Sequence, residues 1–406
     1  MSAPSSTSPA PAAGGDGPAG LDSTRAWGIV AAAFASMFIS FGIAYSYGAF
    51  LDEIRADFGA GRALGATFFS LTSLVFFGLG GVTGAVADRF GPRRVLIVGA
   101  AALAIGLVVT TRADSVEVAL AAYGLGVGIG VACAYVPMVA LVGAWFERRR
   151  TFALGIAVAG IGMGTLVVPP LAAALVERMD WRDAYLILAA AGTAVLLMCA
   201  VVARRAPVRQ QGGGMRLGAA MRTADYRWLY LGGLTLSIAL FVPFVHLPDY
   251  AEERGVDPVL AAGLVGAIGT ASVVGRLALG AVADAIGLLR AYQGCFVLVA
   301  ISFAVWWVAG ESYAVLLVFT ILLGVGYGGF VALSPAVVAA RFGIEGLGAM
   351  LGVLYTGAGI GSAIGPPLAG AMIDEVGYGA TIVGALVVSV LSLAVVLPVS
   401  RAEGTG

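Results

Sequence analysis

Apolar stretches of about twenty residues recur along the whole of this 406-residue chain, and they leave few choices of fold. Twelve such windows are separated by short charged clusters. Hydrophobic residues make up 60% of the chain and charged residues only 11%, whereas a soluble domain has about 25% charged residues. The sequence therefore predicts an all-α membrane protein with twelve transmembrane helices. The windows cover approximately residues 26–50, 63–87, 93–111, 117–144, 151–176, 183–203, 227–250, 258–283, 288–310, 313–340, 347–373 and 378–400.

The arginines are distributed unequally between the two sides of the predicted membrane. The chain has 23 basic residues, and all of them are arginines. When successive connections are assigned to alternate sides, sixteen arginines fall on the side that holds both ends of the chain, six fall on the other side, and Arg276 lies inside a helix. Cytoplasmic loops are enriched in basic residues. We therefore expect a protein of the cytoplasmic membrane with both termini inside the cell.

Composition also divides the chain. Residues 1–25 are rich in Ser, Pro, Ala and Gly and lack the features of a signal peptide, so we expect a disordered cytoplasmic tail. Residues 204–225 are basic and Gly-rich, which indicates a cytoplasmic linker between two bundles of six helices, at residues 26–203 and 226–400. Residues 401–406 form a short C-terminal tail.

The two predicted bundles repeat each other in sequence. The segment GAVAD at residues 84–88 recurs at residues 280–284, an offset of 196. The Gly and Pro spacing of residues 126–137 recurs at an offset of 198, and that of residues 160–170 recurs at an offset of 197. Parallel repeats of this kind are related by an axis along the membrane normal, and they predict a central site between two halves that move against each other.

A charged motif lies in the first copy of the repeat. Residues 84–94 close one helix, turn at Gly91 and open the next helix. The Asp88 carboxylate could bind the free N–H groups of that helix or pair with an arginine across the loop. This stretch resembles the signature loop of the major facilitator superfamily, and the resemblance covers residues 25–400 with all twelve helices. It implies a latch that stabilises the outward-open state at the cytoplasmic face. The candidate gating residues here are Asp88, Arg89, Gly91 and, in the second copy, Asp284.

A second stretch carries a narrower resemblance. Residues 145–164 contain an aromatic pair, three consecutive arginines and a Gly-rich helix, in which Gly160 and Gly164 share one face and predict close packing. The stretch resembles a signature of the monocarboxylate transporter family, whose other signature survives in part as Asp22 and Trp27. The resemblance implies secondary transport of small organic monoanions such as lactate or pyruvate, by alternating access, with proton symport or anion exchange. The oxalate/formate exchangers are a related group.

Arg276 is the only charged residue deep inside any of the twelve windows. An arginine at the centre of a membrane helix costs roughly 2.5–3.5 kcal/mol, so we expect it to face a watery cavity on the substrate path. The alternative is a side chain that extends to the cytoplasmic surface or caps main-chain carbonyls. The monocarboxylate resemblance implies that Arg276 binds the substrate carboxylate, for which a guanidinium can donate two parallel hydrogen bonds. Many proton-coupled members have an aspartate where this chain has Ser272, so proton coupling stays open.

Aromatic and imidazole rings complete the candidate site. Three tyrosine hydroxyls lie deep in predicted helices, where they either line a polar cavity or bond neighbouring helices: Tyr135, Tyr327 and Tyr355. Tyr355 shares the depth of Arg276 and is a candidate second ligand of the carboxylate. His246, the only histidine, and its repeat counterpart Tyr45 are expected at the outer mouth. There His246 either takes part in gating and proton transfer or is an interfacial anchor.

Other functions have less support from the residues. The net charge is zero, so no basic excess points to nucleic acid. No catalytic group, metal-ligand spacing or cofactor motif is found, and the three cysteines are unpaired in apolar runs. The expected partners are a carboxylate substrate, the bilayer and, as an open alternative, a proton, with the protein acting as a monomer. Export of hydrophobic compounds on the same fold and a transporter-like membrane sensor remain as alternatives.

Overall fold

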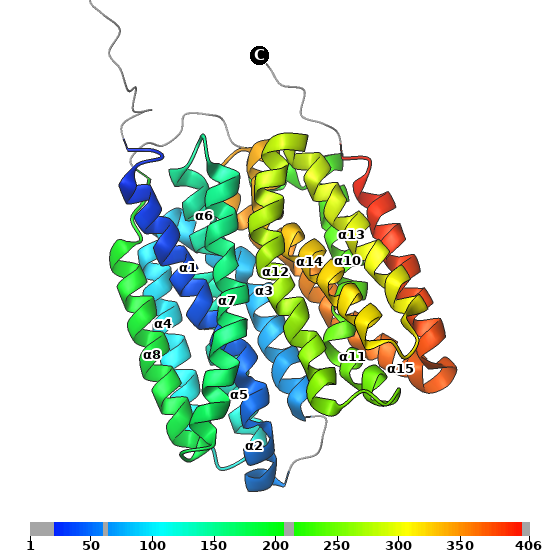
Figure 1. Cartoon of the computed structure of the whole chain (residues 1–406). Coiled ribbons are helices and arrows are strands. Elements are labelled where there is room, and N and C mark those ends of the chain that lie inside the picture. Colours follow the sequence, from blue (N-terminus) through cyan, green and yellow to red (C-terminus); the bar gives the residue numbers. More distant parts are fainter. Residues whose placement is uncertain (1–19, 60–63, 207–214, 400–406) are drawn as a thin grey trace, which may run out of the picture.

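The computed structural model describes residues 20–59, 64–206 and 215–399. In these ranges the chain is built from helices and contains no strand (Figure 1). The first half comprises α1 (Thr24–Tyr45), the 3₁₀ helix η1 (Ser46–Phe50), α2 (Leu51–Phe58), α3 (Leu64–Phe90), α4 (Pro92–Thr111), α5 (Val116–Ala134), α6 (Val136–Trp145), α7 (Arg150–Val176) and α8 (Trp181–Val202). The second half comprises α9 (Leu217–Ala220), α10 (Ala224–Leu240), α11 (Val242–Glu252), α12 (Pro258–Ile286), α13 (Leu288–Ala309), α14 (Tyr313–Phe342) and α15 (Leu347–Val396).

The helices account for the twelve predicted crossings. Eleven helical stretches in the described residues are long and apolar enough to cross a membrane. The last of them, α15, contains Gly377 with φ 81° and ψ 172°, a conformation that no helix adopts, so α15 holds two crossings. The all-α prediction and the number of crossings are confirmed. The short helix α9 lies within the predicted linker, whereas the predicted N-terminal tail up to residue 19 and the C-terminal tail lie outside the described residues.

The crossing formed by α5 and α6 is interrupted. Tyr135 separates α5 from α6 with ψ −77°, and Pro137 follows it without an N–H group to donate. Two main-chain carbonyls at this break accept side-chain hydrogen bonds: Thr83 Oγ1 donates to Ala132 O at 2.9 Å and Ser36 Oγ donates to Ala134 O at 3.4 Å. Side-chain hydroxyls of this kind make broken helices tolerable in a membrane. The break fixes Tyr135 at the centre of the bundle.

The turn between α3 and α4 has the predicted form. Gly91 has φ 93°, which a residue with a Cβ rarely adopts, and it divides the two helices at the predicted position. Gly287 has φ 95° between α12 and α13, so the second copy of the repeat has the same turn. The backbone therefore repeats as the sequence does.

The two halves meet along two seams. In one seam α3 packs against the first part of α15, and in the other α7 packs against α12, as the centre of Figure 1 shows. We call the end of the bundle at which α1 begins and α15 ends, at the top of Figure 1, the terminal face. Both seams are tight toward this face: a Cβ on Gly84 would lie 2.2 Å from Gly348 O, and one on Gly155 would lie 3.0 Å from Arg276 O. The seams close the space between the halves on that side.

Candidate functional site

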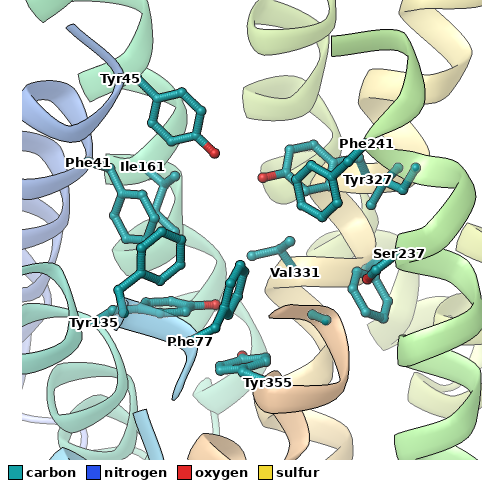
Figure 2. A pocket seen from close by; sticks show the side chains of 14 residues that line it. Phe41, Tyr45, Phe77, Tyr135, Ile161, Ser237, Phe241, Tyr327, Val331 and Tyr355 are labelled. Atoms are coloured by element: carbon teal, nitrogen blue, oxygen red, sulfur yellow. The ribbon is translucent and has the colours of Figure 1, made fainter. Parts of the chain in front are cut away.

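A cavity between the two halves is lined by fourteen side chains (Figure 2). Five of the fourteen are phenylalanines: Phe41, Phe76, Phe77, Phe241 and Phe330. The four candidate tyrosines from the sequence also line it: Tyr45, Tyr135, Tyr327 and Tyr355. The empty space among the fourteen side chains is about 500 Å³, including the part open to solvent, but only about 40 Å³ can hold the centre of a water molecule. The cavity is therefore narrow and largely aromatic.

Both halves contribute rings that face one another. Tyr45 is the last residue of α1, and Tyr327 comes from the middle of α14; Figure 2 shows their hydroxyls directed into the cavity from opposite sides. The rings of Tyr135 and Tyr355 stack at 5.2 Å with an interplanar angle of 13°. The Tyr355 side chain is buried, with 5% of its surface exposed. The four tyrosines thus form one group across the two halves.

Arg276 lies beside this cavity and is only 1% exposed. Its Nη1 donates to Ser272 Oγ at 3.2 Å, and Ser272 Oγ donates in turn to Gly269 O at 2.7 Å. The guanidinium carbon lies 5.5 Å from the centre of the Tyr327 ring, and the charge also interacts with the hydroxyls of Tyr135 and Tyr45. Its Nε has no hydrogen-bond partner among the described residues. Arg276, Ser272 and three of the predicted tyrosines are thus brought together.

The direction of the Arg276 side chain decides between the two sequence interpretations. Its main-chain carbonyl lies at the level of Gly155, whereas its Nη1 lies at the level of Gly162, where a Cβ would be only 2.4 Å away. Gly162 is seven residues, or roughly 10 Å of helix, farther from the terminal face than Gly155. The side chain therefore extends toward the middle of the membrane, and the alternative of reaching the nearer surface is wrong.

The expectation of a watery environment needs correction. Arg276 is not among the fourteen residues that line the cavity, and the walls are mainly phenylalanine and aliphatic side chains. Ile161, which does line the cavity, is the neighbour of Gly162 in α7, against which the guanidinium packs. In this conformation the charge is sealed behind the aromatic wall because the α7–α12 seam is closed around it.

His246 lies outside the candidate site. Its Nε2 is 2.9 Å from Pro366 O, a hydrogen bond from α11 to α15, and it does not line the cavity. Its repeat counterpart Tyr45 does line it. The structure therefore separates the two residues that the repeat paired.

The predicted latch joins different elements from those expected. The Asp88 carboxylate lies beside the backbone N–H of Ala349 in the first turn of α15, and not at the start of α4, the next helix. Arg205 Nη2 donates to the carbonyls of Asp88 (3.2 Å) and Arg89 (2.6 Å), so it caps the end of α3. In the second copy Asp284 is exposed and makes no such contact with any described residue. Only the first copy has its aspartate in a seam.

The two partial monocarboxylate signatures meet at the terminal face. Asp22 Oδ2 accepts hydrogen bonds from the backbone N–H groups of Glu147 (3.3 Å) and Arg148 (3.2 Å). Trp27 packs edge-on against Phe146 with their ring centres 5.1 Å apart. The segment before α1 is thereby fixed to the loop between α6 and α7.

The five cavity phenylalanines were missed in the sequence. Their helices contain other apolar residues that face lipid, such as Leu74 in α3, which is 58% exposed. A phenylalanine that faces lipid and one that faces a cavity are equally apolar, so hydropathy does not separate them. Their depth near that of Arg276 was the one available signal.

As to metals, the described residues contain no group of three His, Cys, Asp or Glu side chains placed to share an ion.

Comparisons with known proteins agree with this architecture. The family model "Major Facilitator Superfamily" matches residues 32–310 and 269–405. Monocarboxylate transporter 3 of Rattus norvegicus is 30% identical over 366 residues, covering 86% of this chain and 74% of that protein. The fujikurins efflux protein of Gibberella fujikuroi is 28% identical over 366 residues, covering 88% and 78%. The crystal structure of the human organic anion transporter MFSD10 superposes with a TM-score of 0.73 at 17% identity, covering 92% and 99%. The chain therefore belongs to the major facilitator superfamily and is a multi-pass membrane transporter.

Proposed function

We propose that this protein is a secondary active transporter of small organic monoanions, and that Arg276 binds the substrate carboxylate. One observation carries the proposal: a guanidinium that is 1% exposed lies at the seam between the halves, beside the central cavity, with no carboxylate partner among the described residues. A buried donor without a partner costs about 1–3 kcal/mol. A bound carboxylate removes this cost and neutralises the charge.

The position of Arg276 also suits alternating access. The guanidinium comes from α12 in the second half and packs against Gly162 of α7 in the first half. When the halves rock, this seam parts and exposes the guanidinium to the other side. We place the terminal face in the cytoplasm because sixteen of the arginines belong to that side. On this assignment the structure represents an outward-facing state of a protein in the cytoplasmic membrane.

The coupling mechanism is proton symport or anion exchange. Among the described residues, those around the guanidinium are Ser272 and three tyrosines, and none of them is an acid that could carry a proton there. Exchange needs no such group, because each anion that leaves is replaced by another.

The two repeats of one chain enclose the cavity, which supports a monomer as the working unit. The similarity to a protein named monocarboxylate transporter 3 supports the substrate class.

A second candidate function is export of hydrophobic compounds. The observation in its favour is the cavity wall, which contains five phenylalanines and four tyrosines. A relative named as an efflux protein for fujikurins is consistent with it. Export of hydrophobic compounds does not need the charge of Arg276. The two candidate functions therefore predict different effects when Arg276 is replaced.

Transport assays in proteoliposomes separate these functions. Labelled lactate or pyruvate is offered to wild type and to Arg276→Gln, with and without a pH gradient, and with and without unlabelled acid inside. We expect Arg276→Gln to lose at least about 30-fold in uptake, since removing one partner of a buried charge pair costs about 2–5 kcal/mol. Arg112→Gln, at an exposed loop position, is the matched control. Undiminished acid uptake by Arg276→Gln would reject the carboxylate role.

The same assay identifies the coupling. Stimulation by an inward proton gradient indicates symport. Stimulation by internal acid alone indicates exchange.

A further inference from the structure

We propose that the preferred substrate carries a flat aromatic ring beside its carboxylate, as benzoate and phenylacetate do. The inference rests on the proposed function, because it assigns the carboxylate to Arg276 and adds a second part of the substrate, which the cavity walls bind.

The walls are suited to a ring. Phe41, Phe76 and Tyr135 form a connected set, with ring centres 5.6 Å apart for Phe41–Phe76 and 5.4 Å apart for Phe41–Tyr135, both edge-to-face. On the side of the second half, Phe241 lies 6.4 Å from Tyr327, also edge-to-face. Aromatic pairs favour edge-to-face and offset arrangements at these distances. An aromatic ring between the two sets would extend the same packing.

The polar groups are few, and the fourteen lining residues include no charged side chain. Ser237 Oγ is already engaged, because it donates to Gly233 O at 2.7 Å. The guanidinium of Arg276 and the tyrosine hydroxyls are the remaining donors around the space. A substrate that matches this distribution has one anionic end and an otherwise apolar body.

A small acid such as lactate fits the walls poorly. It would occupy the region of the guanidinium and leave water among the phenylalanine rings. A buried water needs two to four polar partners, which phenylalanine does not provide. A ring would displace that water and gain free energy from burial of its apolar surface.

The size of the cavity favours a compact body. Only about 40 Å³ of it can hold the centre of a water molecule. A single ring is smaller than a branched or globular group and needs less separation of the walls.

The test measures binding to the full-length purified protein by isothermal titration calorimetry with four probes. Phenylacetate and acetate share a carboxylate and differ by the ring. Lactate represents the small acids, and phenylacetamide is the neutral counterpart of phenylacetate. We expect phenylacetate to bind about 10- to 100-fold more tightly than acetate or lactate, the range for burying one aromatic side chain. Phenylacetamide should bind at least about 30-fold more weakly than phenylacetate.

A matched pair of variants tests the wall itself. Phe241 lines the cavity, whereas Phe244 packs on the same Tyr327 ring at 5.9 Å and does not line it. Phe241→Leu should weaken phenylacetate about 3- to 10-fold, the worth of an aromatic contact, and leave lactate unchanged. Phe244→Leu should leave both unchanged. Phe77→Leu, in the other half, is a second wall variant in case Phe241→Leu fails to fold.

The outcomes separate this inference from the proposed function. Equal binding of phenylacetate, acetate and lactate overturns the aromatic preference and leaves the carboxylate role of Arg276 intact. Equal binding of phenylacetamide and phenylacetate overturns the proposed function. Phe241→Leu could also weaken the binding of phenylacetate and lactate equally. This result overturns the inference, because Phe241 would then support the folded structure without contacting the ring of the substrate.

Discussion

The two seams between the halves occupy equivalent places in the repeat but are built differently. An offset of 196 relates Gly80 and Gly84 of α3 to Arg276 and Gly280 of α12. In the α3–α15 seam a Cβ on Gly84 would lie 2.2 Å from Gly348 O. In the α7–α12 seam a Cβ on Gly280 would lie 3.9 Å from the nearest atom, Thr151 O, an ordinary contact. At these equivalent positions one seam is closed by backbone against backbone, and the other leaves room for a methyl group.

The difference shows how one fold separates closure from binding. Where the first repeat has Gly80, the second has Arg276, whose permanent positive charge lies next to the cavity. The first copy of the charged motif contacts α15 through Asp88, whereas the equivalent residue of the second copy, Asp284, is exposed. We conclude that the α3–α15 seam mainly holds the terminal face closed, whereas the α7–α12 seam carries the binding site.

The largest effect is expected from alanine at the tight seam. Gly84→Ala places a methyl group against a main-chain carbonyl of the opposite half, which cannot rotate away, so this seam must separate. Overpacking costs about 1–3 kcal/mol, so the ratio of molecules closed to molecules open at the terminal face should fall by about 5- to 150-fold. Spin labels at the exposed positions Arg94 and Glu345, one in each half, report the change as a longer distance.

Gly280→Ala is the matched control for this prediction. It changes the equivalent residue of the looser seam and should leave the label distance unchanged. Equal shifts in the two variants would mean that the seams do not differ in tightness.

A smaller effect is expected from alanine beside the guanidinium. A Cβ on Gly162 would lie 2.4 Å from Arg276 Nη1 and 2.5 Å from Val273 Cγ2, so Gly162→Ala should displace the guanidinium without removing it. We expect carboxylate binding, measured by calorimetry, to weaken about 10-fold, because charge-assisted hydrogen bonds depend on geometry. Gly78→Ala has nothing within 4 Å of the added methyl group and serves as the control. Unchanged binding in Gly162→Ala would argue against this position for the carboxylate.

A still smaller effect is expected from the two aspartates of the repeated motif. Asp88→Asn removes a negative charge near the N-terminus of α15, an interaction worth about 0.3–1 kcal/mol, so the closed population should fall about two- to five-fold. Asp284→Asn removes an exposed charge without such a contact. The same pair of spin labels measures both variants. If Asp284→Asn shifted the distance as much, the latch would not depend on the seam.

The smallest effect is expected from an ion pair that lies within one half. Asp57 accepts hydrogen bonds from Trp181 Nε1 (2.7 Å) and Arg182 Nη1, and these two contacts lower the pKa of its carboxyl group. A lowered pKa stabilises the fold above the unfolded-state pKa of about 3.9, and this contribution is lost as pH falls through the lower folded-state pKa. The pair is half exposed, so we expect Asp57→Asn to cost about 0.2–1 kcal/mol at pH 7, with a smaller difference from wild type near pH 3.

Thermal unfolding at the two pH values measures this contribution. The label distance across the terminal face should not change in Asp57→Asn, because the pair joins α2 to α8 and crosses neither seam. A change in that distance would show that contacts within a half also set the closure.

The sequence predicted the central features of the site through its repeat and its charges. Two six-helix repeats require a centre between them, and Arg276 is the one charge buried deep in a helix. Tyr135, Tyr327 and Tyr355 were expected to line a cavity or to bond neighbouring helices, and the structure places all three at the cavity. Charge and hydroxyl groups are costly in a membrane, so the positions of these residues are constrained.

The rest depended on which helix faces which. Gly80 and Gly84 would fit a lipid-facing or a packed surface equally well, so only the structure shows that they meet Gly352 and Gly348. For the same reason the sequence could not show that Asp88 meets α15, or that His246 bonds to Pro366 while Tyr45 lines the cavity. Local patterns fix the depth of a residue, but contacts between helices depend on rotation about their axes.

The most direct test of the account is the affinity of purified protein for a carboxylate in three forms of residue 276. Wild type, Arg276→Lys and Arg276→Gln are titrated with phenylacetate and lactate after thermal unfolding has shown that all three are folded. We predict measurable binding in wild type, weakened binding in Arg276→Lys, which keeps the charge without the planar fork, and a loss of at least about 30-fold in Arg276→Gln. Equal affinity of wild type and Arg276→Gln for both acids would contradict the account.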